Sequence, residues 1–475
     1  MSHKWVAGSV DRLSEAALHD VKQEMQKYVH LLTYDNIQMS FRVFSQRLDN
    51  QGSFGNGTAA TVYIKRGAEP LSSQANQLFQ EYRAKGLENP LTPLEIMDAS
   101  IRVEPRLRLQ MAYHIRRLLF QSPQFDFSTY HGRDSASLQA PVADSSRQLP
   151  HGPDHTTSQY LLGSVDIPEA AYEDHTRLLE EWLKQLGLGS CESHKDIGVN
   201  RVIPIVGDQL TVDRMRGLIT FRAEDMNSYD RLNWLLAICG WLHTMMTFGK
   251  SMHKQYFGTS KGRGLKQAFE LLQRKGLHTT ATKGPFHHHL VEALYHIGEA
   301  HIHAEWLSIA GVMNLAELRD KGPEELLHLS DLLLEKCAST EALRTMDNIP
   351  QNQQDAERRQ VIMFNRDVLH FILLNEAIKH GDIGTMEDML PTLLFRFVGG
   401  QSSNYATEIL ELMQGLYREW PPEIADFVRQ NCWLVNFSGK PDMFLPIDQA
   451  QEFNIKDIKV GNLLLCIYHW HPYST

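Results

Sequence analysis

Segments with the composition of β-strands are few in this chain and lie far apart, and their spacing limits the fold more than any other feature. Residues 264–429 show helical periodicity punctuated by Gly and Pro, with few β-rich runs and no fixed internal repeat. The strand-like segments lie on either side of this stretch. This order predicts an α/β protein that is mostly helical, with a mixed sheet assembled from distant segments.

The first strand-like segments are joined by short links. Residues 28–33 and 37–44 are rich in β-branched and aromatic residues, and residues 59–65 alternate in polarity as a strand does. A loop of Gly, Ser and Asn at 51–58 separates the last two segments. Strands with links this short pair antiparallel, so we expect a three-strand meander with the last two strands side by side, after an amphipathic helix at 13–28.

A buried strand follows much later. Residues 200–206 are apolar and β-branched, and the run stops just before Asp208. Because long helical segments separate it from the meander, we expect this strand to lie parallel to the first one, after a right-handed crossover. Residues 229–257 predict an apolar strand or helix followed by an amphipathic helix. Residues 431–437 predict a closing strand, and 446–459 a closing helix.

Three carboxylates occupy notable positions in this arrangement. Asp35 lies at or just after the first strand, Asp208 ends the buried strand, and Glu452 lies on the closing helix. Acids on adjacent strand ends and on a helix packed against them can converge. Oxygen ligands of this kind suit two-metal phosphoryl transfer, in which two hard cations activate the attacking oxygen and stabilise the leaving one. We therefore predict that these three residues are catalytic and bind metal, with Mg²⁺ or Mn²⁺ as the cofactor.

Each acid also has a structural interpretation. Asp35 belongs to an Asp-Asn dipeptide, which is typical of turns. Asp208 is a good N-cap for a helix that begins just after it. Glu452 alone is typical of a solvated helix.

Other groups of potential metal ligands also have structural interpretations. Asp382 and Glu387 lie between two predicted helices, where capping explains them first, and they are the reserve candidates for the third metal ligand. Cys239 and His243 are four residues apart in an apolar block. A buried pair is favoured there over a zinc site.

The overall charge argues against a nucleic-acid partner. The chain carries 47 Lys and Arg against 57 Asp and Glu, a net charge of −10, whereas proteins that hold DNA through many phosphates are usually basic. DNA is therefore expected as a partner only through a local patch, a bound metal or another domain. One basic stretch, interpreted as a solvated helix face, contains Arg102, Arg106, Arg108, Arg116 and Arg117.

Cysteine usage and missing motifs exclude other classes of function. Five scattered cysteines without a CxxC pair support neither a disulfide framework nor a Cys-rich zinc module, which predicts an intracellular, reducing location. No P-loop, GxGxxG or GxSxG motif occurs, so no nucleotide cofactor is expected. No signal-peptide pattern opens the chain and the most apolar stretch, 232–246, is too short to span a bilayer, so no membrane association is expected.

Longer motifs resemble those of a known family. The segments YDNI, GDQLTVDRMRG, GWLHTMM, GPFHHHLVEALYHI and GDIGTMEDMLP are similar to those of an uncharacterised family of proteins from mushroom-forming fungi, whose hallmark is the pentapeptide GDQLT. The resemblance extends over about residues 34–460. After Val460 the pattern stops, and the C-terminal tail is atypical of the family.

The order of elements resembles the RNase H-like core of DDE transposases. That resemblance implies a five-stranded mixed sheet with a large all-helical insertion, and it places the fifth strand at 232–243. Asp35 matches the first acid of that core, Asp208 the second and Glu452 the third. No DNA-binding module precedes Asp35, so target recognition is expected to be missing or supplied elsewhere.

The resemblance also implies the domain organisation and the function. The function is that of a transposase-derived protein, in that case nuclear, with metal-dependent DNA strand cleavage or transfer. The alternative is a catalytically inactive helical interaction protein that retains the same fold. The domains are the first half of the core with helix and meander (1–66), a helical segment with a flexible linker at about 126–158 (67–190), the second half of the core (191–245), the helical insertion (246–430), and the closing strand and helix with the atypical tail (431–475).

Overall fold

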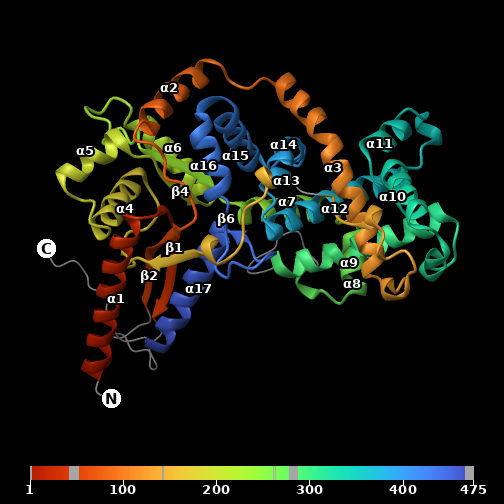
Figure 1. Cartoon of the computed structure of the whole chain (residues 1–475), viewed down its shortest axis with the longest axis horizontal. Coiled ribbons are helices and arrows are strands. Elements are labelled where there is room, and N and C mark those ends of the chain that lie inside the picture. The colour runs from red at the N-terminus through yellow and green to blue at the C-terminus, as the bar shows by residue number, and fades with distance from the viewer. Residues whose placement is uncertain are drawn as a thin grey trace.

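The computed structural model describes residues 3–41, 53–141, 144–259, 262, 264–277 and 287–465. The protein has an α/β part built around one sheet and a body of packed helices, and the two lie side by side along the longest axis of the molecule (Figure 1). The strands of the sheet are β1 (Val29–Phe41), β2 (Ser53–Lys65), β3 (Thr157–Leu161), β4 (Ile203–Gly207) and β5 (Leu235–Cys239).

The sheet is mixed, with the strand order β3-β2-β1-β4-β5. β2 pairs antiparallel with both β1 and β3, whereas β4 is parallel to β1 and β5 is parallel to β4. The predicted five-stranded mixed sheet is thus confirmed, including the parallel alignment of the 200–206 segment with the first strand.

The predicted meander is wrong. Residues 28–33 and 37–44 were expected to form two strands, but β1 is continuous from Val29 to Phe41. β2 pairs with it along its whole length, so that residues 59–65 lie opposite 29–35 and not opposite 37–44. The turn-prone Asp-Asn dipeptide stays extended because distant side chains hold the residues before it. The Thr33 hydroxyl donates to Gln451 Oε1 at 3.0 Å, and the Tyr34 hydroxyl lies 2.9 Å from a ring nitrogen of His175. The third antiparallel strand is therefore β3, from a later segment; residues 42–52 lie outside the described ranges.

Helices cover both faces of the sheet. One face packs an apolar cluster that includes Tyr34, Trp182, Ile205 and Met215, all buried. The opposite face packs against α17 (Ile447–Leu465) and the start of the helical body. The helices on the first face are α1 (His3–Met25), α4 (Tyr172–Gln185), α5 (Cys191–Asn200) and α6 (Gln209–Phe221).

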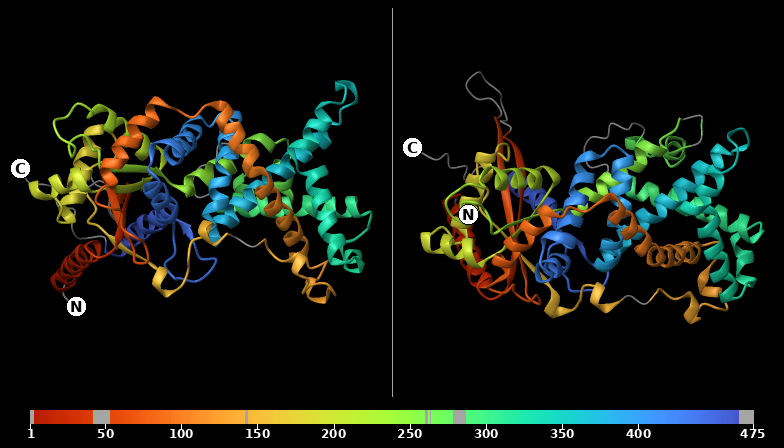
Figure 2. Two further views of the ribbon diagram at one scale, coloured as in Figure 1. Left: turned by 45° about the horizontal axis from the view of Figure 1, so that its top comes forward. Right: turned by 90° about the horizontal axis from the view of Figure 1, so that it is seen from above.

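The helical body contains the segment 246–430 that was predicted to be an insertion. At its centre lies α12 (Ala356–His380), which buries residues on most of its sides. Figure 2 shows α2 and α3 running along the outside of the body from the sheet. No helix in the described ranges is long and apolar enough to cross a membrane. The other helices are α2 (Ala75–Glu88), α3 (Pro93–Gln121), α7 (Trp241–Tyr256), α8 (Leu265–Leu271), α9 (His287–Ala310), α10 (Pro323–Cys337), α11 (Thr340–Asp347), α13 (Ile383–Asp388), α14 (Leu390–Gly399), α15 (Ser403–Gln414) and α16 (Pro422–Asn431).

Only the first part of the basic stretch on α3 is a solvated face: Arg102 and Arg106 are exposed, whereas Arg116 and Arg117 are not. Arg116 is buried and its guanidinium donates to the Ser330 hydroxyl at 2.8 Å. Arg117 forms an ion pair with Glu376 on α12 at 2.7 Å. Apolar residues of the same helix fill the core beside them, so these arginines anchor α3 to the body from within.

The segment 126–158, expected to be a flexible linker, follows the surface of the helical body through four short 3-10 turns. Two of its aliphatic residues, Leu138 and Leu149, are buried. The Leu149 amide donates to the Gly381 carbonyl at 2.8 Å, and the segment then continues into β3. Both leucines enter the core of the helical body, so few apolar residues are enough to hold the segment there.

The closing segment returns from the helical body to the sheet. The strand expected at 431–437 is reduced to β6 (Leu434–Val435), which pairs with β7 (Leu445–Pro446) and not with the main sheet. α17 then crosses the sheet face. Of the atypical tail, residues 466–475 lie outside the described ranges.

Candidate functional site

Asp35 lies on β1, two residues beyond Thr33, which pairs with β4. Since side chains alternate along a strand, Asp35 projects to the same face as Thr33, the face covered by α17. The side chain is half-buried. Burial, followed by the charges of Asp208 and Glu452, raises the pKa of Asp35 to about 7. The three predicted acids therefore lie within electrostatic reach of one another.

Asp208 follows β4 directly and is the N-cap of α6. Its Oδ1 accepts a hydrogen bond from the Thr211 amide at 2.8 Å, so it caps the helix. Asp208 also lies two residues beyond Val206, the β4 partner of Thr33, as Asp35 lies two beyond Thr33. Adjacent strands are about 4.8 Å apart. Asp35 on β1 and Asp208 just after β4 thus lie at matching distances beyond the same paired position, and capping uses only one of the Asp208 oxygens.

α17 is held on the sheet by two amide side chains. Gln451 accepts from the Thr33 hydroxyl and donates to the Ala59 carbonyl at 2.9 Å, which joins α17 to β1 and β2. Asn454 donates to side chains of β2 and β3. These bonds fix the position of Glu452, whose side chain is 44% exposed at the edge of the sheet.

Asp448, one turn before Glu452, closes the first turn of α7. Its carboxylate accepts hydrogen bonds from the amides of Leu242 at 3.0 Å and His243 at 3.1 Å, and lies 3.0 Å from His243 Nδ1. His243 Nε2 is 3.8 Å from Glu452 Oε1. Burial lowers the pKa of His243, but the hydrogen bond and charge of Asp448, with Asp208 and Glu452, raise it to about 9. An imidazolium therefore stands between the two acids of α17 at neutral pH.

A further acid, Glu169, lies just before α4 and is 5% exposed. Its carboxylate accepts hydrogen bonds from the Thr211 hydroxyl and from the Asn36 side chain at 3.3 Å. His175 Nε2 lies 3.9 Å away and has no hydrogen-bond partner in the described part of the chain. Burial raises the pKa of Glu169 to about 8; the Thr211 bond opposes this rise and the charges of the two aspartates add to it.

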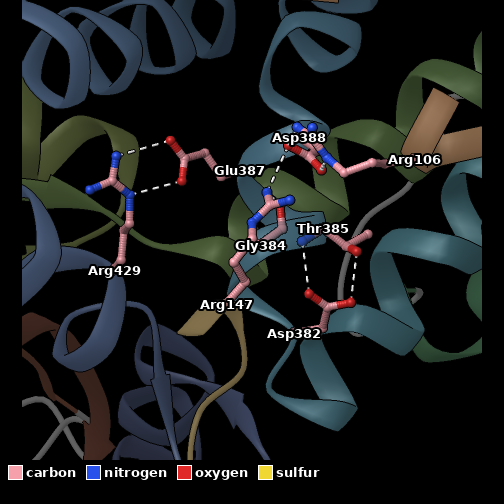
Figure 3. Close-up of polar contacts among 8 residues, drawn as sticks. All are labelled: Arg106, Arg147, Asp382, Gly384, Thr385, Glu387, Asp388 and Arg429. Atoms are coloured by element: carbon pink, nitrogen blue, oxygen red, sulfur yellow. Dashed lines mark hydrogen bonds and ion pairs between the residues drawn. The ribbon is translucent and has the colours of Figure 1, made fainter. Parts of the chain in front are cut away.

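The reserve candidates lie on and beside α13 in the helical body, where Figure 3 shows their contacts. Asp382 is the N-cap of α13 and accepts from the Thr385 amide at 2.8 Å and hydroxyl at 2.7 Å. Glu387 forms a two-point ion pair with Arg429 at 2.8 and 3.0 Å. Capping therefore accounts for Asp382, as expected, whereas an arginine accounts for Glu387.

Three residues of this edge were not proposed as site residues from the sequence. Asp448 does carry a signal, because it lies four residues before Glu452 on a predicted helix and so shares its face. His243 was assigned to a buried pair with Cys239, and its neighbours proved to be acids. Glu169 carries no signal, since nothing around it in the sequence predicts burial.

The donor set of the edge is made of carboxylate oxygens, which hard divalent cations prefer. The charges that act on Asp35 are those of Asp208, Glu452 and His243, and Glu452 Oε1 lies 3.8 Å from His243 Nε2. Within the described ranges, no three His, Cys, Asp or Glu side chains converge closely enough to hold a metal ion as they stand. The site is therefore a pair of adjacent aspartates with further acids at longer range.

Comparison with known proteins gives a family. Residues 86–462 match the model of a family of unknown function, DUF6589, which is well over half of the chain. The chain belongs to DUF6589. No curated protein and no solved structure matches it. The DUF6589 match begins after β2, so it includes Asp208 and Glu452 but not Asp35, and the resemblance expected from residue 34 onward is shown only from residue 86.

Proposed function

We propose that this DUF6589 protein carries out metal-dependent phosphoryl transfer on DNA, with an RNase H-like core of the DDE transposase type. One observation carries the proposal. Asp35 on β1 and Asp208 directly after β4 each lie two residues beyond a paired position of these two parallel strands, and α17 brings Glu452 toward them. A five-stranded mixed sheet with acids at these three places is what the resemblance to DDE transposases implies.

The chemistry of the donor set fits a hard cation. Asp35 is half-buried beside two other acids, and such a group ionises at a cost unless a cation compensates it. Asp35, Asp208 and Glu452 are the residues that would hold Mg²⁺ or Mn²⁺. The bound metal would supply Lewis-acid stabilisation of the attacking and leaving oxygens.

The other residues of the edge position these ligands. Gln451 fixes the position of α17 on the sheet, and thereby the position of Glu452. His243 holds Asp448 by a hydrogen bond and faces Glu452, so it orients both acids. With a pKa of about 8, Glu169 is mostly protonated at neutral pH, which limits the negative charge next to the aspartates.

The test is Mg²⁺-dependent nicking or strand transfer on a DNA duplex by the full chain. Asp208→Asn keeps the helix cap, since Asn and Asp are equivalent at that position, but removes the charge that would bind metal. We expect a loss of about 100-fold or more. The matched control is Asp355→Asn, another N-cap whose carboxylate accepts from the Arg358 amide at 2.8 Å but which lies in the helical body. Equal activity of wild type and Asp208→Asn would remove Asp208 from the reaction.

The alternative function is a catalytically inactive interaction protein with the same fold. The net charge of −10 favours it, because an acidic surface repels DNA. Absence of nicking by the wild type, together with no binding of Mg²⁺ or Mn²⁺ by calorimetry, would support this second function over the first.

A further inference from the structure

A cavity of about 540 Å³ opens in the helical body between α7, α12 and α14. Its charged lining comprises Lys254 from the last turn of α7, Arg366 and Asp367 from α12, and Arg396 from α14. The cavity thus has three cationic residues and one acid, in a chain whose net charge is negative. It is a local basic site of the kind that an acidic protein needs if it is to contact phosphate.

The single acid does not neutralise the cavity. Asp367 is buried and lies between two guanidinium groups, at 3.0 Å from Arg366 and 2.5 Å from Arg396. One carboxylate balances only one of these cations, and Lys254 adds a further positive charge. Burial is the main reason that the pKa of nearby His370 is lowered to about 4, and the charges of Arg366 and Arg396 lower it further, against that of Asp367.

An exposed aromatic ring stands at the same cavity. Phe395, which lines it, is 45% exposed on α14, whose Leu393, Leu394 and Phe397 are buried. Cationic groups beside an exposed aromatic side chain are the combination that binds single-stranded nucleic acid, since the cations contact phosphate and the ring stacks on a base.

Two connections place the cavity beside the acidic edge of the sheet. His243 and Lys254 are 254 − 243 = 11 residues apart on α7, so they lie on the same side of the helix, about 16 Å apart. Gln401 lines the cavity, and three residues later Asn404 hydrogen-bonds to Gln209, the neighbour of Asp208. A stacked strand advances about 3.4 Å per nucleotide, so roughly five nucleotides span the interval.

We propose that this cavity binds one nucleotide of a DNA strand, with the phosphate against Arg366 and Lys254 and the base on Phe395. The inference rests on the proposed function, because the strand is the one whose phosphodiester roughly five nucleotides away lies at Asp35 and Asp208. It assigns strand binding to the helical body and the chemistry to the sheet, so the two can be tested separately.

The test is fluorescence anisotropy with a short labelled oligothymidylate and the full chain in EDTA, so that metal-dependent chemistry plays no part. Lys254→Gln should weaken binding and lower the slope of log K against log salt by about 0.7, the value for one phosphate contact on a single strand. Phe395→Ala should weaken binding about five-fold or more, through loss of base stacking. Matched controls are Lys336→Gln and Phe221→Ala, two exposed residues outside the cavity that should leave binding unchanged.

Two outcomes would overturn the inference. Wild-type affinity and an unchanged salt slope in both Lys254→Gln and Phe395→Ala would remove the cavity from strand binding. Competition by thymidine monophosphate or inorganic phosphate as strong as that of the oligonucleotide would make free phosphate the ligand. Asp208→Asn separates the two proposals: it should bind the oligonucleotide normally. If binding depends on Lys254 while the wild type does not nick DNA, the cavity stands and the proposed reaction falls.

Discussion

Buried carboxylates are treated in opposite ways by the two parts of the molecule. In the helical body each contacts a cation: Asp388 bonds both Arg106 and Arg147 at 2.7 Å. Burial raises the pKa of Glu376 in the same body, but the hydrogen bond and charge of Arg117 lower it to about 2. At the sheet edge, burial and the charges of Asp208 and Glu452 raise the pKa of Asp35 to about 7, and no arginine is among the described groups that lower it.

This difference separates structural acids from acids held ready for a ligand. Acids that form ion pairs join two segments of the helical body, and the arginines that they contact neutralise their charges. Acids whose pKa values are raised by burial and by one another cost stability, and such groups concentrate at functional sites. Four kinds of change test this difference: removal of a partner arginine, a change of pH, addition of a divalent cation, and substitution of an acid.

The largest effect is expected from removing a cation in the helical body. Arg117→Met leaves the buried Glu376 without its principal partner, and breaking a buried pair costs about 3–5 kcal/mol. Urea denaturation should show a lower unfolding free energy of this order. Arg102→Met, an exposed position on the same helix α3, should change it by less than about 0.5 kcal/mol. Equal effects of the two substitutions would mean that the pair does not stabilise the body.

The second effect is that the stability of the sheet edge and that of the helical body depend on pH in opposite directions. The pKa values of Asp35, Glu169 and His243 are raised to about 7, 8 and 9, so each binds its proton more tightly when folded. Their contribution to the unfolding free energy is complete below the pKa of the unfolded state. It is lost as pH rises through the pKa of the folded state, that is from about 4 to 9. Glu376 behaves oppositely, because its lowered pKa gives stability that is lost as pH falls from about 4.5 to 2.

Each pKa unit corresponds to at most about 1.4 kcal/mol. Hydrogen exchange of peptides from β1 and α12 can follow the two parts separately. Protection of β1 should fall between pH 5 and 9 while protection of α12 is maintained. A parallel loss in both peptides would show that the pH dependence does not arise at the sheet edge.

A smaller effect is expected from divalent cations. If Mg²⁺ binds the folded edge alone, it should stabilise the protein by about 1.4 kcal/mol at ten times its Kd. The stabilisation should be larger at pH 8 than at pH 5, where Asp35 is protonated, and should be absent in Asp208→Asn. Melting temperatures with Mg²⁺ and with EDTA measure it. An identical shift in wild type and Asp208→Asn would place the cation elsewhere.

The smallest effect is expected at Glu169. This residue is mostly protonated at pH 7, so Glu169→Gln changes little charge and should alter the unfolding free energy by less than about 1 kcal/mol. Glu376→Gln removes a charge paired with Arg117, and should cost clearly more. Comparison of the two variants by urea denaturation tests whether unpaired and paired acids really differ. A larger loss of unfolding free energy in Glu169→Gln than in Glu376→Gln would contradict this difference between the two parts.

Local sequence was sufficient for some elements and not for others. Asp208 was predicted both to end a buried strand and to cap a helix, because both follow from a short apolar run before an Asp. The continuity of β1 through Asp35 was not predictable, since the side chains that hold it come from Glu169, His175 and Gln451, more than a hundred residues away. Local turn propensity points the other way at that position.

The choice of the third acid shows the same limit. Glu452, Asp382 and Glu387 all lie on or beside predicted helices, and the sequence contains no signal that Arg429 pairs with Glu387. Gly240 is another example. A Cβ there would lie 2.2 Å from Asp448 Cγ, so only glycine fits between β5 and α7, but this contact joins residues 208 positions apart.

The bond between Thr33 and Gln451 also has a consequence for biosynthesis. A ribosome adds about 5–20 residues per second, so 451 − 33 = 418 residues separate the two partners by roughly 20–80 seconds of translation. During that interval the central strand has been made but the helix that covers its acidic face has not. A nascent chain at that stage therefore has Asp35 and Asp208 without Glu452, and any nuclease activity of this edge begins only after α17 has been made.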